Sequence, residues 1–67
     1  MAEILLWNLR RERGITLVEL EKMTGLGKTT LNNIENHKVS PTIDEVEKIC
    51  RGMGVTFREL FRSEYND

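Results

Sequence analysis

Three threonines, Thr16, Thr42 and Thr56, each stand three residues before a glutamate, and this spacing constrains the fold more than any other feature of the chain. In a T-x-x-E segment, the threonine oxygen can accept a hydrogen bond from an early helical N–H. The glutamate side chain can reach back to the N–H of the threonine, which completes a capping box. The sequence therefore predicts helices that begin directly after residues 16, 42 and 56.

Glycines indicate where the helices end. Gly14, Gly25 and Gly54 each precede an apolar residue, and glycine adopts the left-handed conformation after a last helical turn without a steric cost. Starts and ends together predict five helices, at about residues 3–13, 17–24, 28–36, 43–53 and 57–64. No segment alternates between apolar and polar residues with a period of two, so we predict an all-α fold without strands.

Each predicted helix carries an apolar face when its residues are spaced at about 100°. A chain of 67 residues has room for one small core, so we expect residues 1–67 to form a single domain. Ile4 and Trp7 lie off the apolar face of the first helix. The expected core residues are Leu6, Leu9, Ile15, Leu20, Leu26, Leu31, Ile34, Ile43, Val46, Ile49, Cys50, Met53, Val55, Phe57 and Leu60.

Several classes of protein and site do not fit this sequence. The single cysteine, Cys50, allows no internal disulfide and no thiolate cluster, and His37 has no second ligand beside it, so neither a metal nor a cofactor is expected. No apolar run approaches the roughly 20 residues that span a bilayer, and the first arginines follow the apolar stretch, the reverse of a signal peptide. We expect a cytoplasmic protein without catalytic residues or a small-molecule effector.

The helix predicted over residues 28–36 has a polar face that suits contact with DNA. When Leu31 faces the core, the opposite side carries no acidic and no bulky apolar side chain. Asparagine can donate and accept at adenine, lysine can donate to guanine, and a threonine methyl can contact the thymine methyl. An ordinary solvated face is the alternative, but the turn at Gly25 presents the tip of this helix outward. The face consists of Thr29, Asn33 and Asn36, with Asn32 beside them and Lys28 at the amino-terminal tip.

The net charge of −1 argues mildly against a nucleic-acid binder, because such proteins are usually basic. The charges are, however, unevenly distributed. Residues 1–43 carry six basic and five acidic side chains, whereas residues 44–67 carry four basic and six acidic ones. A DNA-facing surface is therefore expected in the first two-thirds of the chain.

Residues 6–60 resemble the phage repressor and Cro-like helix-turn-helix domains, also called the XRE family. The resemblance rests on Leu9-Arg10, Gly14, Leu20, Gly25, Leu31, Ile34-Glu35-Asn36, Pro41, Ile49, Gly54-Val55 and Leu60. It implies a compact five-helix lambda-repressor-like domain whose third helix enters the major groove of double-stranded DNA. It also implies a homodimer on a two-fold operator, with half-sites about one helical turn apart.

The resemblance also assigns roles to particular residues. The base-reading positions of the family fall on Lys28, Thr29 and Asn33, with Asn32 beside them. The positions that approach DNA phosphates fall on Thr16, Leu17, Thr30, Asn36, Lys38 and Ser40. Arg10 and Glu35 fall where several members form a buried ion pair, and the alternative is that Arg10 binds a phosphate.

The chain departs from the family pattern at four positions. Leu17 stands where a phosphate-binding glutamine is common, and Glu21 stands where a small alanine separates the second and third helices. Thr24 replaces a core aliphatic residue, and His37 replaces the glycine that follows the third helix. These changes are expected to alter DNA affinity and docking angle more than the fold.

Trp7, Phe61 and Tyr65 have two interpretations, contact with a partner subunit or packing within the chain. The sequence as a whole favours a sequence-specific DNA-binding transcriptional regulator, a small repressor that acts by occupying a promoter. The alternative is an antitoxin or protein-interaction module that retains the fold with weak DNA binding. The acidic balance, Leu17 and Glu21 favour this alternative.

Overall fold

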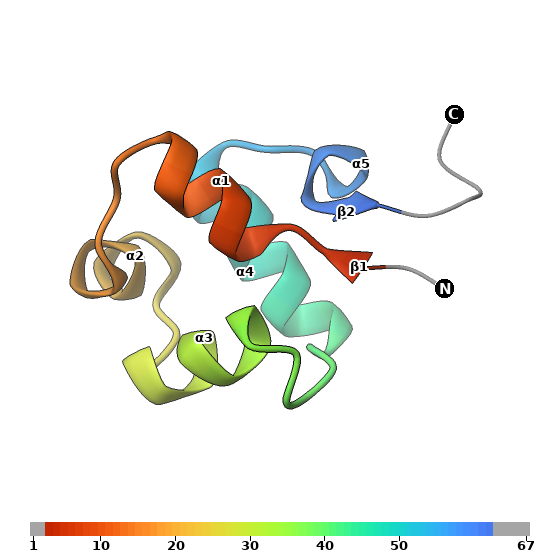
Figure 1. Ribbon diagram of the computed structural model, residues 1–67, viewed down its shortest axis with the longest axis horizontal. Coiled ribbons are helices and arrows are strands. Elements are labelled where there is room, and N and C mark those ends of the chain that lie inside the picture. The colour runs from red at the N-terminus through yellow and green to blue at the C-terminus, as the bar shows by residue number, and fades with distance from the viewer. Residues whose placement is uncertain (1–2, 63–67) are drawn as a thin grey trace.

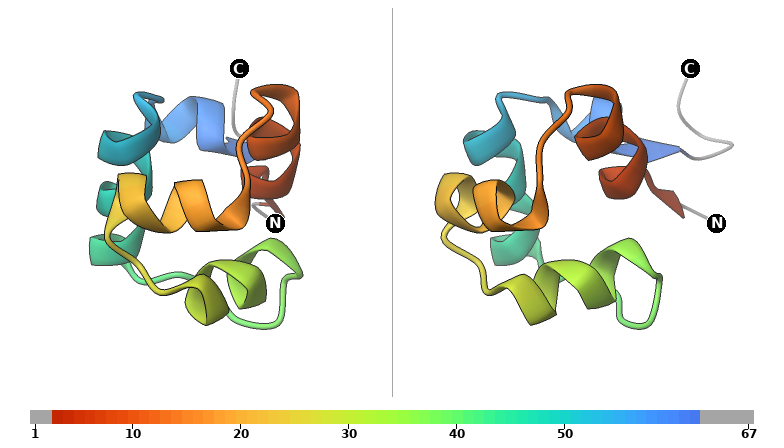
Figure 2. Two further views of the ribbon diagram at one scale, coloured as in Figure 1. Left: turned by 90° about the vertical axis from the view of Figure 1, so that its left-hand side faces the viewer. Right: turned by 60° about the vertical axis from the view of Figure 1, so that its left-hand side comes forward.

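A computed structural model describes residues 3–62 as five helices and two short strands (Figure 1). In chain order these are β1 (Glu3–Ile4), α1 (Leu6–Glu12), α2 (Leu17–Thr24), α3 (Lys28–Glu35), α4 (Ile43–Met53), α5 (Phe57–Leu60) and β2 (Phe61–Arg62). α2 packs against both α4 and α3. Figure 2 shows α3 at one edge of the molecule, with its outer side turned away from the other helices.

All three predicted capping boxes form, at the starts of α2, α4 and α5. In each, the threonine oxygen accepts from the glutamate N–H at 3.1 Å, and the glutamate accepts from the threonine N–H at 2.9 Å. These bonds from Thr16 and Thr56 hold the pKa of Glu19 and of Glu59 below its usual value. The starts of three helices are therefore fixed by contacts that span only three residues.

The helix ends also follow the sequence closely. Gly14, Gly25 and Gly54 adopt positive φ angles of 66°, 78° and 68°. α2 and α4 occupy the predicted ranges, and α3 ends one residue earlier than predicted.

The prediction of a mainly helical fold with five helices is confirmed, but the prediction that there is no strand is wrong at the two ends of the described region. β1 pairs with β2 in an antiparallel arrangement, and Figure 1 shows the two strands side by side. As a result α1 begins only at Leu6 rather than near residue 3, and α5 ends at Leu60. The predicted continuation of this last helix to residue 64 passes beyond the described residues.

The core lies where α1 to α5 converge. Leu9, Ile15 and Cys50 are only partly buried and pack against its edge. The buried apolar residues are Ile4, Leu6, Leu20, Leu26, Leu31, Ile34, Val46, Ile49, Met53, Val55 and Leu60.

Two predicted core residues, Ile43 and Phe57, are instead 72% and 56% exposed. Each directly follows a capping threonine as the first residue of its helix, so it lies at a helix end that projects beyond the core. Ile4, which had no place in the predicted apolar faces, is buried because it belongs to β1 rather than to a helix.

Thr24 is buried in the position where an aliphatic residue was expected. Its hydroxyl donates to the carbonyl of Leu20 at 2.8 Å and accepts from the N–H of Leu26 at 3.2 Å. A buried hydroxyl that makes both bonds avoids the cost of an unsatisfied polar group, so threonine fits this core position.

Candidate nucleic-acid interface

The α2–α3 turn positions the candidate interface, and Glu21 caps its second helix. α3 begins after Gly27, which offers no side chain as a cap. The Glu21 carboxylate accepts a hydrogen bond from the N–H of Lys28, at 3.1 Å. A negative charge is favourable at the positive end of a helix. Glu21 therefore stabilises the start of α3, a role that the sequence did not suggest.

α3 divides into a buried side and an outward side. Leu31 and Ile34 are completely buried. Thr29 and Asn33 lie on the opposite side of the helix, with Asn32 beside them and Lys28 at the amino-terminal tip. Among these, Lys28, Thr29 and Asn32 are exposed and Asn33 is half-buried. This outward surface lies at the edge of the molecule (Figure 2). Its contact with bases stays a prediction.

The candidate phosphate contacts lie at the two ends of α3 and at the start of α2. Lys38 and Ser40 are exposed in the loop that follows α3, and Thr30 is half-buried within the helix. Asn36 ends α3 and donates from Nδ2 to Oδ1 of Asn32, at 3.2 Å.

At the start of α2, the Thr16 hydroxyl oxygen already accepts a bond within the capping box. The first N–H groups of a helix lack partners within it and favour anions. Backbone amides are therefore the groups that remain for a phosphate there.

Arg10 and Glu35 form a two-pronged ion pair that joins α1 to the end of α3. Arg10 Nε lies 2.6 Å from Oε2 and Nη2 lies 3.1 Å from Oε1. The Arg10 and Glu35 side chains are only 16% and 2% exposed. Arg10 Nη1 also donates to the carbonyl of Ile15 at 3.0 Å. All three guanidinium nitrogens therefore donate within the protein, which favours the structural interpretation of Arg10 over the phosphate-binding one.

His37, which stands where the family has a glycine, takes the left-handed conformation with a φ of 59°. Its Nε2 lies 3.4 Å from the carbonyl oxygen of Ile4. The loop after α3 is thereby brought close to β1, at the end of α3 that lies away from Lys28.

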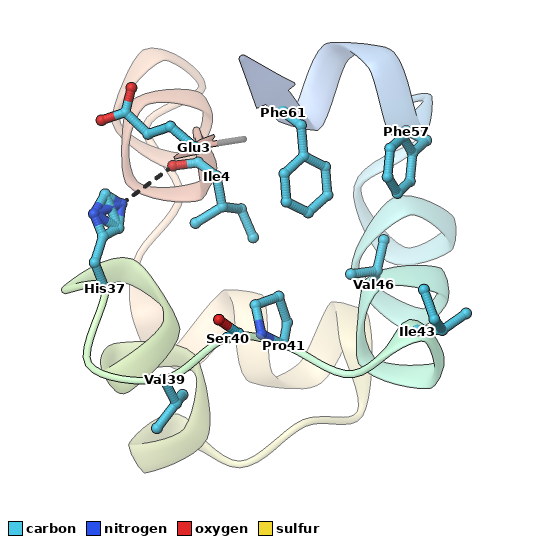
Figure 3. A pocket seen from close by; sticks show the side chains of 10 residues that line it. All are labelled: Glu3, Ile4, His37, Val39, Ser40, Pro41, Ile43, Val46, Phe57 and Phe61. Carbon is cyan, nitrogen blue, oxygen red and sulfur yellow. Dashed lines mark hydrogen bonds between the residues drawn. The ribbon is translucent and has the colours of Figure 1, made fainter. Parts of the chain in front are cut away.

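An apolar groove of about 570 Å³ lies beside this loop (Figure 3). The Phe57 and Phe61 rings stack along it, with their centroids 4.7 Å apart. The groove is lined by Glu3, Ile4, His37, Val39, Ser40, Pro41, Ile43, Val46, Phe57 and Phe61.

Phe61, one of the three candidate dimer contacts, lines this groove. Trp7 is 44% exposed on α1, with the Arg11 guanidinium 4.8 Å from the centre of its ring. Tyr65 lies outside the described residues.

Two other kinds of site are absent from residues 3–62. No cluster of three histidine, cysteine or acidic side chains there is arranged to hold a metal ion. No helix there has the length and apolar character that a membrane span requires.

Comparisons with known proteins agree with this geometry. The profile of the helix-turn-helix family HTH_3 matches residues 8–60. The HTH-type transcriptional regulator SutR of Escherichia coli (strain K12) is 41% identical over 49 residues, which cover 73% of this chain and 28% of SutR. An uncharacterized HTH-type transcriptional regulator, y4dJ of Sinorhizobium fredii (strain NBRC 101917 / NGR234), is 33% identical over 52 residues, covering 78% of this chain and 68% of y4dJ.

A solved structure shows the same fold. The crystal structure of an HTH_3 family transcriptional regulator from Vibrio cholerae matches with a TM-score of 0.76 and 40% identity. The match covers 79% of this chain and 30% of the Vibrio cholerae chain. This chain thus matches less than a third of the length of that regulator, and of SutR.

Proposed function

Since this chain belongs to the helix-turn-helix family HTH_3, we propose that it is a DNA-binding transcriptional regulator that recognises a specific sequence. The observation that carries the proposal is the outward side of α3, which has hydrogen-bonding side chains and no acidic residue. The similarity to proteins named as transcriptional regulators supports it. In this proposal the protein acts in the cytoplasm and represses by occupying a promoter, without a small-molecule effector.

The proposed mode of binding places α3 in the major groove. An α-helix is about 10–12 Å wide and the groove about 12 Å. Lys28, Thr29 and Asn33, with Asn32, read base edges, while Lys38 and the first amides of α2 hold phosphates. The Arg10–Glu35 pair fixes α3 against α1 and thereby the angle at which α3 is presented.

We further propose that the protein binds DNA as a homodimer through the apolar groove. Ile43 and Phe57, which line it, leave large apolar surfaces exposed, and exposed apolar patches on small soluble proteins often mark interfaces. The groove adjoins the loop after α3, so a two-fold dimer formed there directs the carboxyl ends of the two α3 helices toward each other. Each α3 then faces a separate half-site.

The dimer can be tested by substituting one groove residue. We expect Phe57→Glu to shift the protein from dimer to monomer in sedimentation analysis, because a carboxylate in the interface loses its hydration. Met23, 41% exposed on α2 and outside the groove, supplies the control Met23→Glu, which should remain dimeric. The proposal would be contradicted if the parent chain bound a two-fold DNA site as a monomer. It would also be contradicted if Phe57→Glu and Met23→Glu had the same oligomeric state.

DNA reading is tested by selecting bound sites from a random duplex pool and then comparing two variants. Asn33→Ala should relax the preference at one base pair of each half-site, by about 1–3 kcal/mol. Lys38→Ala should weaken binding to all sequences alike and reduce the salt slope by about one.

The outcome of this experiment also distinguishes the second candidate function. A protein-interaction module with the same fold would show little binding to random duplex and little dependence on salt. The Glu21 carboxylate at the start of α3 favours that candidate, because it places a negative charge at an end of the helix that faces DNA. Equal affinity of both variants and the parent chain for every duplex would refute base reading by α3.

A further inference from the structure

A small hollow of about 260 Å³ lies between the first turns of α2 and α3. It is lined by Leu17, Lys28, Thr29 and Asn32. Leu17 is half-buried and packs against the core, so its side chain is held in place at this point. The hollow therefore presents a fixed aliphatic wall within a surface that is otherwise polar.

The amide of Asn32 is oriented by Asn36, the residue that directly follows α3. Its Oδ1 accepts a hydrogen bond from Nδ2 of Asn36, at 3.2 Å. Within residues 3–62, Asn32 Nδ2 has no partner of its own. The hollow thus combines an apolar wall with an available hydrogen-bond donor.

A phosphate does not suit this hollow. The N–H of Lys28, which could bind a phosphate oxygen, already donates to the carboxylate of Glu21 at 3.1 Å. The negative charge of Glu21 also offsets the positive charge that the Lys28 side chain brings to the hollow. A neutral base edge is therefore the better occupant.

Resting on the DNA-binding function proposed above, we propose that this hollow reads a thymine. In the major groove, thymine presents the C5 methyl beside the O4 acceptor, whereas cytosine presents an amino donor and no methyl. The methyl packs between Leu17 and the methyl group of Thr29, and O4 accepts from Nδ2 of Asn32. Leu17 is then a specificity-determining residue, because its side chain at the start of α2 contacts the methyl group that distinguishes thymine from cytosine.

The methyl group can be removed without any other change to the DNA. A selected duplex is prepared with one thymine of one half-site replaced by deoxyuridine, position by position, and its affinity is measured. Burying a methyl-sized group is worth about fourfold in affinity, so the parent should bind one of these duplexes about fourfold more weakly. The other replacements should have a smaller effect.

Variants of the hollow's lining residues then show whether the fourfold loss of affinity arises there. With Leu17→Ala, the thymine and deoxyuridine duplexes should bind almost equally. Thr29→Ser, which removes one exposed methyl group without touching the core, should reduce the fourfold difference, so the test does not depend on how well the Leu17 variant folds. Met23→Ala, an apolar truncation on the same helix outside the hollow, should keep the full difference.

The inference fails if no thymine methyl matters to the parent, or if the fourfold difference survives both Leu17→Ala and Thr29→Ser. These results would leave the DNA-binding function intact, since the parent would still bind its selected site. A parent chain without salt-dependent affinity for any duplex would overturn the inference together with the proposed function.

Discussion

Replacing Arg10 with alanine is expected to lower the free energy of unfolding by about 3–5 kcal/mol, because it leaves a buried charge without its partner. The Glu35 side chain is only 2% exposed, and both of its oxygens accept from Arg10. The carbonyl of Ile15 loses its bond from Arg10 as well. Since small domains have only about 5–15 kcal/mol of stability, the variant should be largely unfolded well below the melting temperature of the parent.

Urea or thermal unfolding followed by circular dichroism measures this loss. The matched control is Arg11→Ala on the same helix, since Arg11 is exposed and contacts the face of the Trp7 ring. Removing a surface charge of this kind should change stability by about 0.5 kcal/mol. If Arg10→Ala and Arg11→Ala melted together, the ion pair would have no structural importance.

A double substitution separates the buried charge from the packing. Arg10→Met combined with Glu35→Leu removes both charges and retains apolar volume, and such replacements are often neutral or stabilising. We therefore expect the double variant to be much more stable than Arg10→Ala. A double variant as unstable as Arg10→Ala would instead assign the loss to packing of the arginine stem.

The parts of the fold that were predictable are those set by short-range hydrogen bonds. A T-x-x-E box joins residues three apart, and Gly25 and Gly54 end their helices by local backbone conformation. The limits of α2 and α4 follow from these contacts. The outward side of α3 was also predictable, because burying Leu31 fixes the direction of every other residue on that helix.

The parts that were missed depend on residues far apart in the chain. β1 and β2 pair although they lie at opposite ends of the described sequence. The pattern of apolar residues within either segment does not indicate a partner that far away in the chain. The cap that Glu21 gives to α3 crosses the intervening turn. Ile43 and Phe57 carry apolar side chains on predicted helices, but only the arrangement of those helices shows that their first residues lie outside the core.

A long-range contact of the same kind underlies the second large prediction, that Gly52→Ala destabilises the protein by about 2 kcal/mol. A Cβ at Gly52 would lie 2.8 Å from the carbonyl carbon and close to the carbonyl oxygen of Met23, and 3.0 Å from Cα of Thr24. Overpacking costs about 1–3 kcal/mol, and here the obstacle is backbone rather than a flexible side chain. The gain in helix propensity from glycine to alanine, about 1 kcal/mol, does not offset a forced separation of α2 from α4.

Gly27 provides the matched control, because an added Cβ meets nothing within 4 Å there and its φ of −64° suits any residue. We expect Gly27→Ala to cost no more than about 1 kcal/mol, the usual effect of alanine at the start of a helix. Because α3 packs on α2, displacing α2 should also shift α3. Those molecules of the Gly52→Ala variant that remain folded should therefore bind DNA more weakly than the parent. If Gly52→Ala and Gly27→Ala were equally stable, α2 and α4 would not be in close contact at Gly52. The proposal that this contact supports α3 would then be wrong.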